Sequence, residues 1–140
     1  MTLGPLKVRY QSIEKPSGLR LRYPGLHRHK DNSFTYLGGS SGRERTHIYG
    51  GLLTENCVQS LARDIVMEQC LWIRAKFATP ERRSVIATTT HDEVVSIVPA
   101  ERGAECLAYS LERMKIQPVW CRDLPLSASG GMGVSYGAVK

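Results

Sequence analysis

Residues 84–98 have the sequence SVIATTTHDEVVSIV and are the most informative segment of this chain. Two runs, Ser84 to Thr90 and Val94 to Val98, are rich in Val, Ile and Thr, which favour β-strands. Only His91-Asp92-Glu93 lies between them, so the two strands are predicted to pair as a hairpin. Tight hairpins usually place Asn-Gly, Asp-Gly or Gly-Gly at the turn, because the central residues need positive φ. Since no glycine is present here, these residues are predicted to serve something other than turn geometry.

Two adjacent acids at the tip of a hairpin suggest a chemical role. A cross-strand ladder fixes the backbone of such a tip, so Asp92 and Glu93 would be held rigidly. Hard divalent cations prefer carboxylate oxygens, which makes this pair a candidate half-site for such an ion. A solvated polar turn that binds nothing is the alternative that the pattern leaves open.

The composition indicates an ordinary soluble protein. The 140 residues suffice for one domain with a core, and 41% hydrophobic with 23% charged residues is typical of globular chains. The chain has no apolar run of about eighteen residues, so no membrane-spanning helix and no membrane partner are expected. The first residues lack the apolar segment of a secretory signal, which predicts a cytoplasmic location. The widely spaced Cys57, Cys70, Cys106 and Cys121 form no CxxC pair and are predicted to be reduced thiols.

The positive charge is concentrated in the first third of the chain. The net charge is +6, and residues 1–50 contain nine Lys or Arg against three acids, whereas residues 51–140 contain ten of each kind. This asymmetry predicts a polyanionic partner, namely nucleic acid. A basic surface that only maintains solubility is the alternative.

The first third is predicted to be a basic ribbon followed by a loop. Leu6 to Tyr10 and Leu19 to Tyr23 alternate apolar and basic residues, which predicts two strands with Arg20 and Arg22 on the same side. Residues 25–51 are predicted to be irregular. Within them His27 and His29 could bind a metal and the Gly38 to Gly42 stretch could cradle a phosphate. A plain loop is the favoured interpretation of both, because the histidines have no third ligand and the glycine stretch lacks a GK(S/T) ending and a preceding apolar strand.

Two helices are predicted in the remainder. The first runs from Thr54, its expected N-cap, to about Phe77, with Gln59 and Arg63 directed away from its core face. That core face is predicted to contain Val58, Leu61, Ala62, Ile65, Val66, Cys70 and Ile73. The second helix follows Pro99 and is predicted to bury Ala104, Leu107, Ala108, Leu111 and Met114. A short strand is predicted at residues 124–129.

This order of elements predicts an α+β fold, with antiparallel hairpins and two main helices packed on them. No internal repeat or clean boundary is present, so residues 1–140 are predicted to form a single partial domain. In this description residues 1–50 are the basic ribbon and loop, and residues 51–140 are a helix–hairpin–helix core.

Three segments together resemble the family A DNA polymerases, in particular those of phages. The strand–His-Asp-Glu–strand segment at residues 90–95 looks like their motif C. Residues 50–64, GGLLTENCVQSLARD, resemble the long helix that enters the palm, and residues 15–24, KPSGLRLRYP, are similar to a PSGRxLxYP segment that precedes it. The resemblance extends from about residue 6 to the C-terminus and implies the C-terminal portion of a polymerase palm.

The resemblance also implies roles for individual residues. Asp92 would be the metal-binding aspartate of motif C for Mg²⁺, Glu93 the adjacent acid that supports the site or touches a second ion, and His91 a residue near the primer terminus. Because adjacent strand residues point to opposite sides, Asp92 is expected to be the direct ligand.

Gln59 matches a helix glutamine that contacts duplex DNA, Asn56 would be its companion, and Arg63 could contact the backbone. Arg20 and Arg22 are further candidates for DNA contacts. Primer-template DNA and dNTP are the implied partners.

The chain also departs from that family. Motif A, with its second metal-binding aspartate, and the motif B helix, which holds the incoming triphosphate, have no counterpart in this sequence. The chain alone is therefore expected not to polymerise DNA, and a second chain that contains both motifs is an expected partner. A fragment or truncated copy from a phage or prophage, in a bacterial or phage-infected host cell, is equally open. The alternative function is a non-catalytic nucleic-acid-binding protein, and a His91–Asp92 nuclease is a third.

Overall fold

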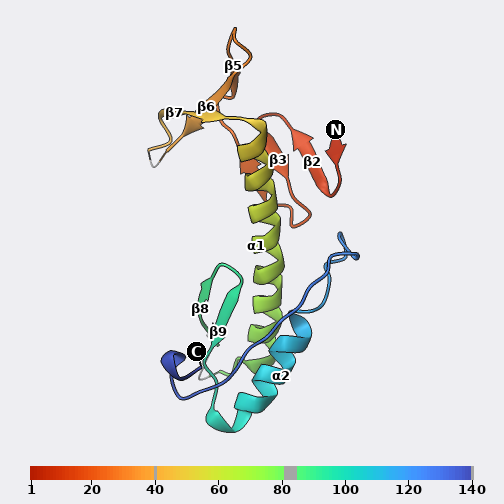
Figure 1. Ribbon diagram of the computed structural model, residues 1–140, viewed down its shortest axis with the longest axis vertical. Coiled ribbons are helices and arrows are strands. Elements are labelled where there is room, and N and C mark those ends of the chain that lie inside the picture. Colours follow the sequence, from red (N-terminus) through yellow and green to blue (C-terminus); the bar gives the residue numbers. More distant parts are fainter. Residues whose placement is uncertain (40, 81–84, 140) are drawn as a thin grey trace. The chain divides into compact units, whose positions relative to one another are not determined.

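The computed structural model describes residues 1–39, 41–80 and 85–139. Within these ranges the chain forms nine β-strands in three antiparallel sheets, together with two α-helices and two short 3₁₀ helices (Figure 1). The predicted α+β class is therefore confirmed. The chain divides into two compact units, Met1–Leu61 and Ala62–Lys140, and the long helix α1 (Gly50–Phe77) contributes residues to both.

The first sheet of the N-terminal unit has four strands in the order β1-β2-β3-β4. These strands are β1 (Thr2–Leu3), β2 (Leu6–Arg9), β3 (Ser12–Glu14) and β4 (Arg20–Arg22). The prediction of a two-stranded ribbon was wrong, because β3 lies between the two predicted strands and pairs with both. Three residues with a single apolar side chain are too short to show an alternating pattern, so β3 escaped detection.

Residues that lie directly opposite each other in antiparallel strands share one face of the sheet. Val8, Ile13 and Leu21 are aligned across β2, β3 and β4, and they form an apolar face. The positions between them place Arg20 and Arg22 together on the opposite face, as predicted. Both arginines are exposed, whereas Leu21 between them is half-buried.

A second sheet occupies much of the segment that was predicted to be irregular. It contains β5 (His27–Arg28), β6 (Phe34–Gly38) and β7 (Glu44–Ile48), in that order. The prediction was wrong because many Gly and Ser residues obscured the β-forming residues Thr35, Tyr36 and Ile48. The Gly38 to Gly42 stretch, of which residue 40 lies outside the described residues, connects β6 and β7 as a hairpin loop. Positive φ values at Gly39 and Gly42 explain its composition.

Helix α1 begins at Gly50, four residues before the predicted start, and ends at Phe77 as predicted. Thr54 is not the N-cap, because it lies inside the helix and its hydroxyl donates a hydrogen bond to the Gly50 carbonyl. The first part of α1 covers the apolar face of the N-terminal unit, whose core consists of Leu6, Ile13, Tyr23 and Ile48. Val58, which was predicted to lie on the core face, is 59% exposed.

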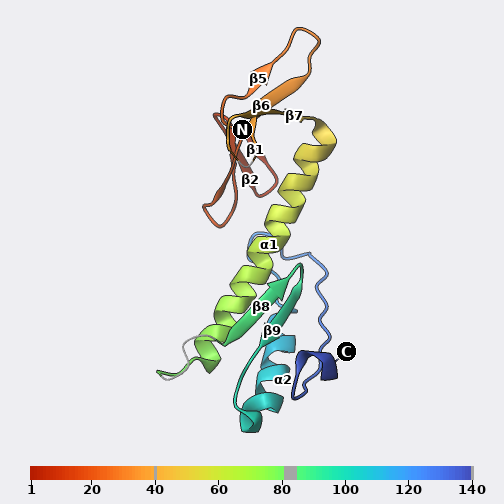
Figure 2. The same cartoon turned by 90° about the vertical axis from the view of Figure 1, so that its left-hand side faces the viewer.

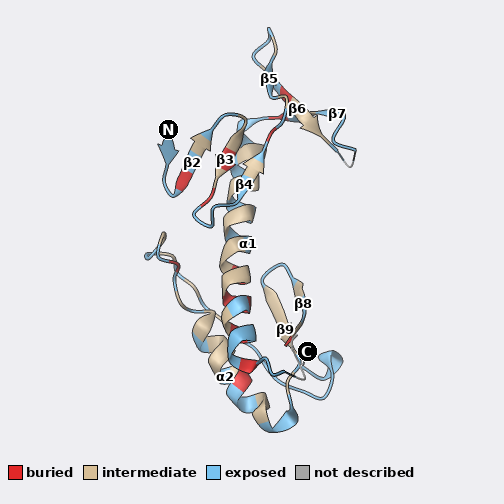
Figure 3. Cartoon of the chain, turned by 180° about the vertical axis from the view of Figure 1, so that it is seen from behind, coloured by how far each residue is buried: buried red, intermediate tan, exposed pale blue. Residues whose placement is uncertain are grey.

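The C-terminal unit is built around the second part of α1. The β8–β9 hairpin (Ile86–Thr90 and Glu93–Ser96) and helix α2 (Gly103–Arg113) flank this part of α1 (Figures 1 and 2). The 3₁₀ turn η1 (Ala100–Arg102) leads into α2. Their shared core consists of Ile73, Phe77, Val85 and Cys106. The buried positions of α1 lie on one side of that helix (Figure 3).

Two details of this unit differ from the predictions. Ala104 and Ala108 are exposed, and Cys106 is the buried residue of α2, because the helix turns its Cys106–Tyr109 side toward Phe77. Residues 124–129 are described but form no strand, since no neighbouring strand pairs with them. The tail instead ends in the 3₁₀ turn η2 (Tyr136–Ala138).

Candidate functional site: an acidic hairpin and a basic sheet face

The predicted hairpin is present, and its turn is tighter than the sequence suggested. Thr90 pairs with Glu93, so only His91 and Asp92 connect the strands, and Glu93 is the first residue of β9. Ser84, the predicted start of the first strand, lies outside the described residues. His91 has φ of 54°, a conformation that costs roughly 1–3 kcal/mol for a residue other than glycine. The turn therefore retains a strained histidine where glycine would relieve the strain.

The two acids of the hairpin have different surroundings. Asp92 is exposed at the tip beside His91. Glu93 is half-buried, and its Oε2 accepts a hydrogen bond of 2.8 Å from the Tyr136 hydroxyl in the C-terminal tail. Glu93 is thus held in place by the tail, whereas Asp92 is open to an incoming ligand. Tyr136 could not be identified from the sequence, because the Gly-rich tail has no periodicity.

The donor set of the hairpin suits only part of a metal site. No three His, Cys, Asp or Glu side chains come together as a metal site anywhere in the described ranges 1–39, 41–80 and 85–139. Two carboxylates fit a hard cation that also binds phosphate oxygens and water, which is how Mg²⁺ is usually held. Any remaining ligands would come from a substrate or another chain.

The polar face of the first sheet is strongly basic. It carries Lys7, Arg9, Arg20 and Arg22 around the single acid Glu14, and this set is here called the basic face. Glu14 Oε2 accepts hydrogen bonds of 3.2 Å from Arg9 Nε and from Arg20 Nη2, and Lys7 Nζ lies 3.7 Å from Oε1. One carboxylate therefore faces several cations, and the face keeps a surplus of positive charge. Lys7 and Arg9 were not singled out from the sequence, although they alternate with Leu6 and Val8.

A shallow cavity of about 240 Å³ lies beside Arg20 and Arg22. Its remaining lining includes Tyr10, Gln11 and Ser12, and Tyr10 is 89% exposed. An exposed aromatic ring next to arginines is a common arrangement for contacts with nucleotides, because bases stack on aromatic rings while arginines bind phosphates.

The three candidate DNA-contacting residues of α1 differ in their exposure to solvent. Gln59 and Arg63 are exposed and lie one helical turn apart. Asn56 is half-buried, and its Nδ2 donates a hydrogen bond of 3.4 Å to the Tyr23 hydroxyl. Burial raises the pKa of Tyr23, and the Asn56 bond opposes that shift. Asn56 thus links α1 to the residue that follows β4, a structural contact that the sequence did not indicate.

Replacement of Glu14 by glutamine is expected to destabilise the chain at neutral pH. The pKa of Glu14 is lowered, chiefly because Arg9 donates a hydrogen bond to it, and nearby positive charges add to this effect. Such a group stabilises the folded state above its ordinary value of 4.5, and this contribution is lost as the pH falls through the lowered pKa. Thermal unfolding at pH 7 and at pH 3 should therefore show a larger difference between wild type and Glu14→Gln at pH 7 than at pH 3.

Glu112→Gln is the matched control for this experiment, because Glu112 is exposed on α2. Its melting temperature should remain close to that of the wild type at both pH values. An unchanged melting temperature of Glu14→Gln at pH 7 would contradict a stabilising role for the ion pairs of the basic face.

An exposed acidic tip and a basic face with an adjacent aromatic ring are suited to a protein that binds nucleic acid. The chain is 36% identical over 127 residues to a DNA polymerase of Bacillus phage SP02, across 84% of this chain. It spans only 18% of the length of that relative. No protein-family model matches the chain, and no solved structure matches it. The chain is thus related to a phage DNA polymerase.

No helix of the described residues combines the length and the apolar character that a membrane span needs.

Proposed function

We propose that this chain is the C-terminal palm segment of a family A DNA polymerase of the phage type. The observation that carries the proposal is the two-residue His91–Asp92 turn, which presents an exposed carboxylate on a rigid hairpin. A relative named as a DNA polymerase supports the assignment. The proposed reaction is template-directed nucleotidyl transfer in DNA replication, with primer-template DNA and dNTP as substrates.

In this reaction the primer 3′-oxygen forms a bond to the α-phosphorus of a dNTP, the α–β phosphoanhydride bond breaks, and pyrophosphate leaves. The hydroxyl proton passes to solvent. Bound Mg²⁺ would lower the pKa of the attacking hydroxyl and neutralise charge on the leaving group. Asp92 would hold the ion directly, Glu93 would support it from its bond to Tyr136, and His91 would lie near the primer end.

The remaining assigned residues would bind duplex DNA. The exposed Gln59 and Arg63 would contact the duplex from α1, while Arg20 and Arg22 would contact phosphates from the basic face. Asn56 would act through its contact with Tyr23, by fixing the helix that presents Gln59.

A second chain with motifs A and B belongs to the proposal, whether this protein is a split subunit or a fragment. Large apolar side chains remain exposed in the structure, among them Tyr49, Val58, Leu71 and Ile97. Such exposure is compatible with a surface that a partner covers. The proposal is tested by mixing the full chain with the preceding part of the related polymerase and measuring Mg²⁺-dependent primer extension. Primer extension is expected only when both chains are present. Failure of the mixture to extend primers would contradict a catalytic role for this chain.

The basic face also favours a second candidate function, a protein that binds nucleic acid without catalysis. In this case DNA binding would weaken steeply with salt and would be indifferent to Mg²⁺. The two candidates are separated by binding and extension assays on the same preparations. A nuclease, the third possibility, would reveal itself by metal-dependent cleavage of DNA in the absence of dNTP.

Arg22→Gln is expected to weaken duplex DNA binding and to reduce the slope of log K against log salt by about 1. The reason is that Arg22 is exposed on the basic face and each phosphate contact releases counterions. Fluorescence anisotropy over a range of salt concentrations measures the slope. Arg122→Gln removes the same charge from an exposed position of the C-terminal unit and should leave the slope unchanged. Equal slopes for Arg22→Gln and wild type would exclude this contact.

A further inference from the structure

The β5–β6–β7 sheet gathers three of the four histidines of the chain on or beside one face. Thr35 of β6 lies directly opposite both His27 of β5 and His47 of β7, so these residues form a row across the sheet. The ring of His29 lies edge-on to that of His27, with 4.8 Å between the ring centroids. Arg45 lies on the same face of the sheet, two residues before His47 on β7.

The opposite face of this sheet packs into the core. Tyr36 and Ile48 alternate with Thr35 and His47 along their strands, and both belong to the core cluster of the N-terminal unit. The histidine-bearing face therefore points away from that core. It borders a cavity of about 610 Å³, lined by His29, Lys30, Asp31, Ser33, Thr35, Arg45 and His47.

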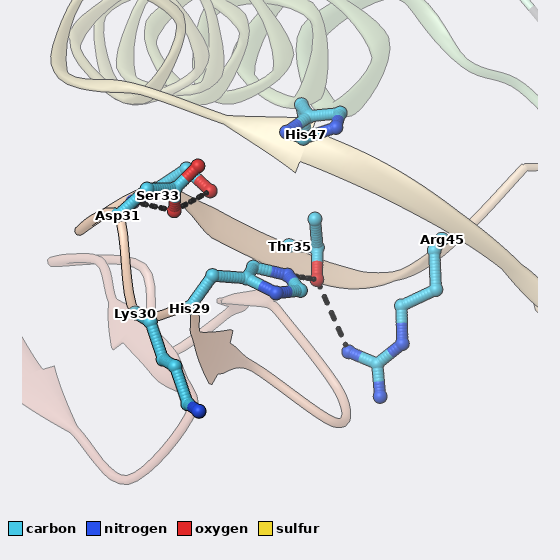
Figure 4. A pocket seen from close by; sticks show the side chains of 7 residues that line it. All are labelled: His29, Lys30, Asp31, Ser33, Thr35, Arg45 and His47. Carbon is cyan, nitrogen blue, oxygen red and sulfur yellow. Dashed lines mark hydrogen bonds between the residues drawn. The ribbon is translucent and has the colours of Figure 1, made fainter.

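A buried hydroxyl organises the cavity (Figure 4). Thr35 is 3% exposed, and its Oγ1 accepts a hydrogen bond of 3.3 Å from Arg45 Nη1 and lies 2.9 Å from His29 Nε2. Arg45 Nη1 also donates to the Gly25 carbonyl at 2.8 Å. These contacts fix the guanidinium at the edge of the cavity. Its Nε and Nη2 make no hydrogen bond within the described part of the chain, so they are available as donors.

The charge of the cavity favours an anion. Lys30 and Arg45 outnumber the single acid Asp31, and the imidazoles add further donors. Asp31 Oδ1 accepts hydrogen bonds from the Ser33 hydroxyl at 2.8 Å and from the Ser33 backbone N–H at 3.0 Å. Its single negative charge leaves the two cations of the cavity in excess. A metal is less well matched, since no three potential ligands converge within the described residues.

We propose that this cavity is a binding site for a phosphate group. Fixed guanidinium donors, a lysine and imidazole N–H groups around a hydroxyl suit a small oxyanion that accepts several hydrogen bonds. The site uses none of the residues of the 91–93 hairpin or of the basic face, and it does not rest on the polymerase proposal. Phosphate binding and primer extension can therefore succeed or fail independently.

The test is a titration of the full-length chain with inorganic phosphate and with pyrophosphate, followed by NMR of the histidine rings and by calorimetry. Saturable binding that shifts the His29 and His47 signals is expected. Lys30→Gln and Arg45→Gln should each weaken it about fivefold, because each removes a charged donor. His47→Gln is a further variant, useful if the loss of Arg45 disturbs the fold through Gly25.

Arg43→Gln is the matched control, since Arg43 is exposed nearby but does not line the cavity. Equal weakening by Arg43→Gln would overturn the proposal, as would unshifted histidine signals. Zinc binding to the histidines without any response to phosphate would also overturn it and would assign the cluster to a metal. Competition by oligonucleotides with and without a 5′-phosphate identifies whether the phosphate comes from nucleic acid or is free.

Discussion

Replacing Asp92 with asparagine is expected to lower Mg²⁺-dependent primer extension by about 10³-fold or more in the mixture with the complementary polymerase chain. The substitution keeps the size of the side chain but removes its charge, and charge is what holds a divalent ion at an exposed tip. Asp92 lies in a two-residue turn, so the change should not alter the hairpin. DNA binding, measured without Mg²⁺, should remain within about twofold of the wild type.

Two further variants make this result specific. Glu93→Gln should cost less, about 10- to 100-fold, because Glu93 is proposed to support the ion while bonded to Tyr136. Asp123→Asn makes the same charge change at another exposed position of the C-terminal unit and should have no effect. If Asp92→Asn extends primers as well as Asp123→Asn does, the magnesium role of the hairpin is wrong.

The elements with local sequence signals could be predicted well. From Thr54 onward, helix α1 has a long apolar periodicity without Gly or Pro, and its end at Phe77 was predicted correctly. The β8–β9 hairpin was predicted because β-branched residues surround a very short connection. The missing glycine had been interpreted as a sign of a functional role, and the positive φ of His91 is a finding of the structure.

Elements that depend on distant partners were missed. The strand β3 has only one apolar residue and is stabilised by β2 and β4 on either side, while β5 is two residues long. Conversely, residues 124–129, predicted as a strand, contain Pro125 and no β-branched residue, and no strand of the described residues pairs with them. A local pattern cannot report whether a pairing edge is available elsewhere in the chain.

The features of the candidate sites also divide into those that the local sequence predicts and those that it does not. The exposure of Asp92 and the shared side of Arg20 and Arg22 follow from local geometry, and the structure agrees with both. The bond between Glu93 and Tyr136 joins residues 43 positions apart, so no spacing rule could reveal it. The His27–Thr35–His47 row likewise exists only through the strand register. From the sequence, only His27 and His29 were identified, as a possible metal-binding pair.

Ile73→Ala is expected to lower the free energy of unfolding of the C-terminal unit by about 2–5 kcal/mol. Ile73 is fully buried in the core with Phe77, Val85 and Cys106, so the substitution would leave a cavity where both helices and the hairpin meet. Both tryptophans of the chain, Trp72 and Trp120, belong to this unit, and their fluorescence during denaturation by urea reports on it selectively.

Leu71→Ala provides the comparison, because Leu71 lies two residues away on the same helix but is 61% exposed. It should cost less than about 1 kcal/mol, since little apolar surface is lost from the core. A small effect of Ile73→Ala would mean that the hairpin and α2 do not depend on a common core with α1. That result would also remove the rigid support on which the proposed role of Asp92 depends, because an unsupported two-stranded hairpin is at best marginally stable in water.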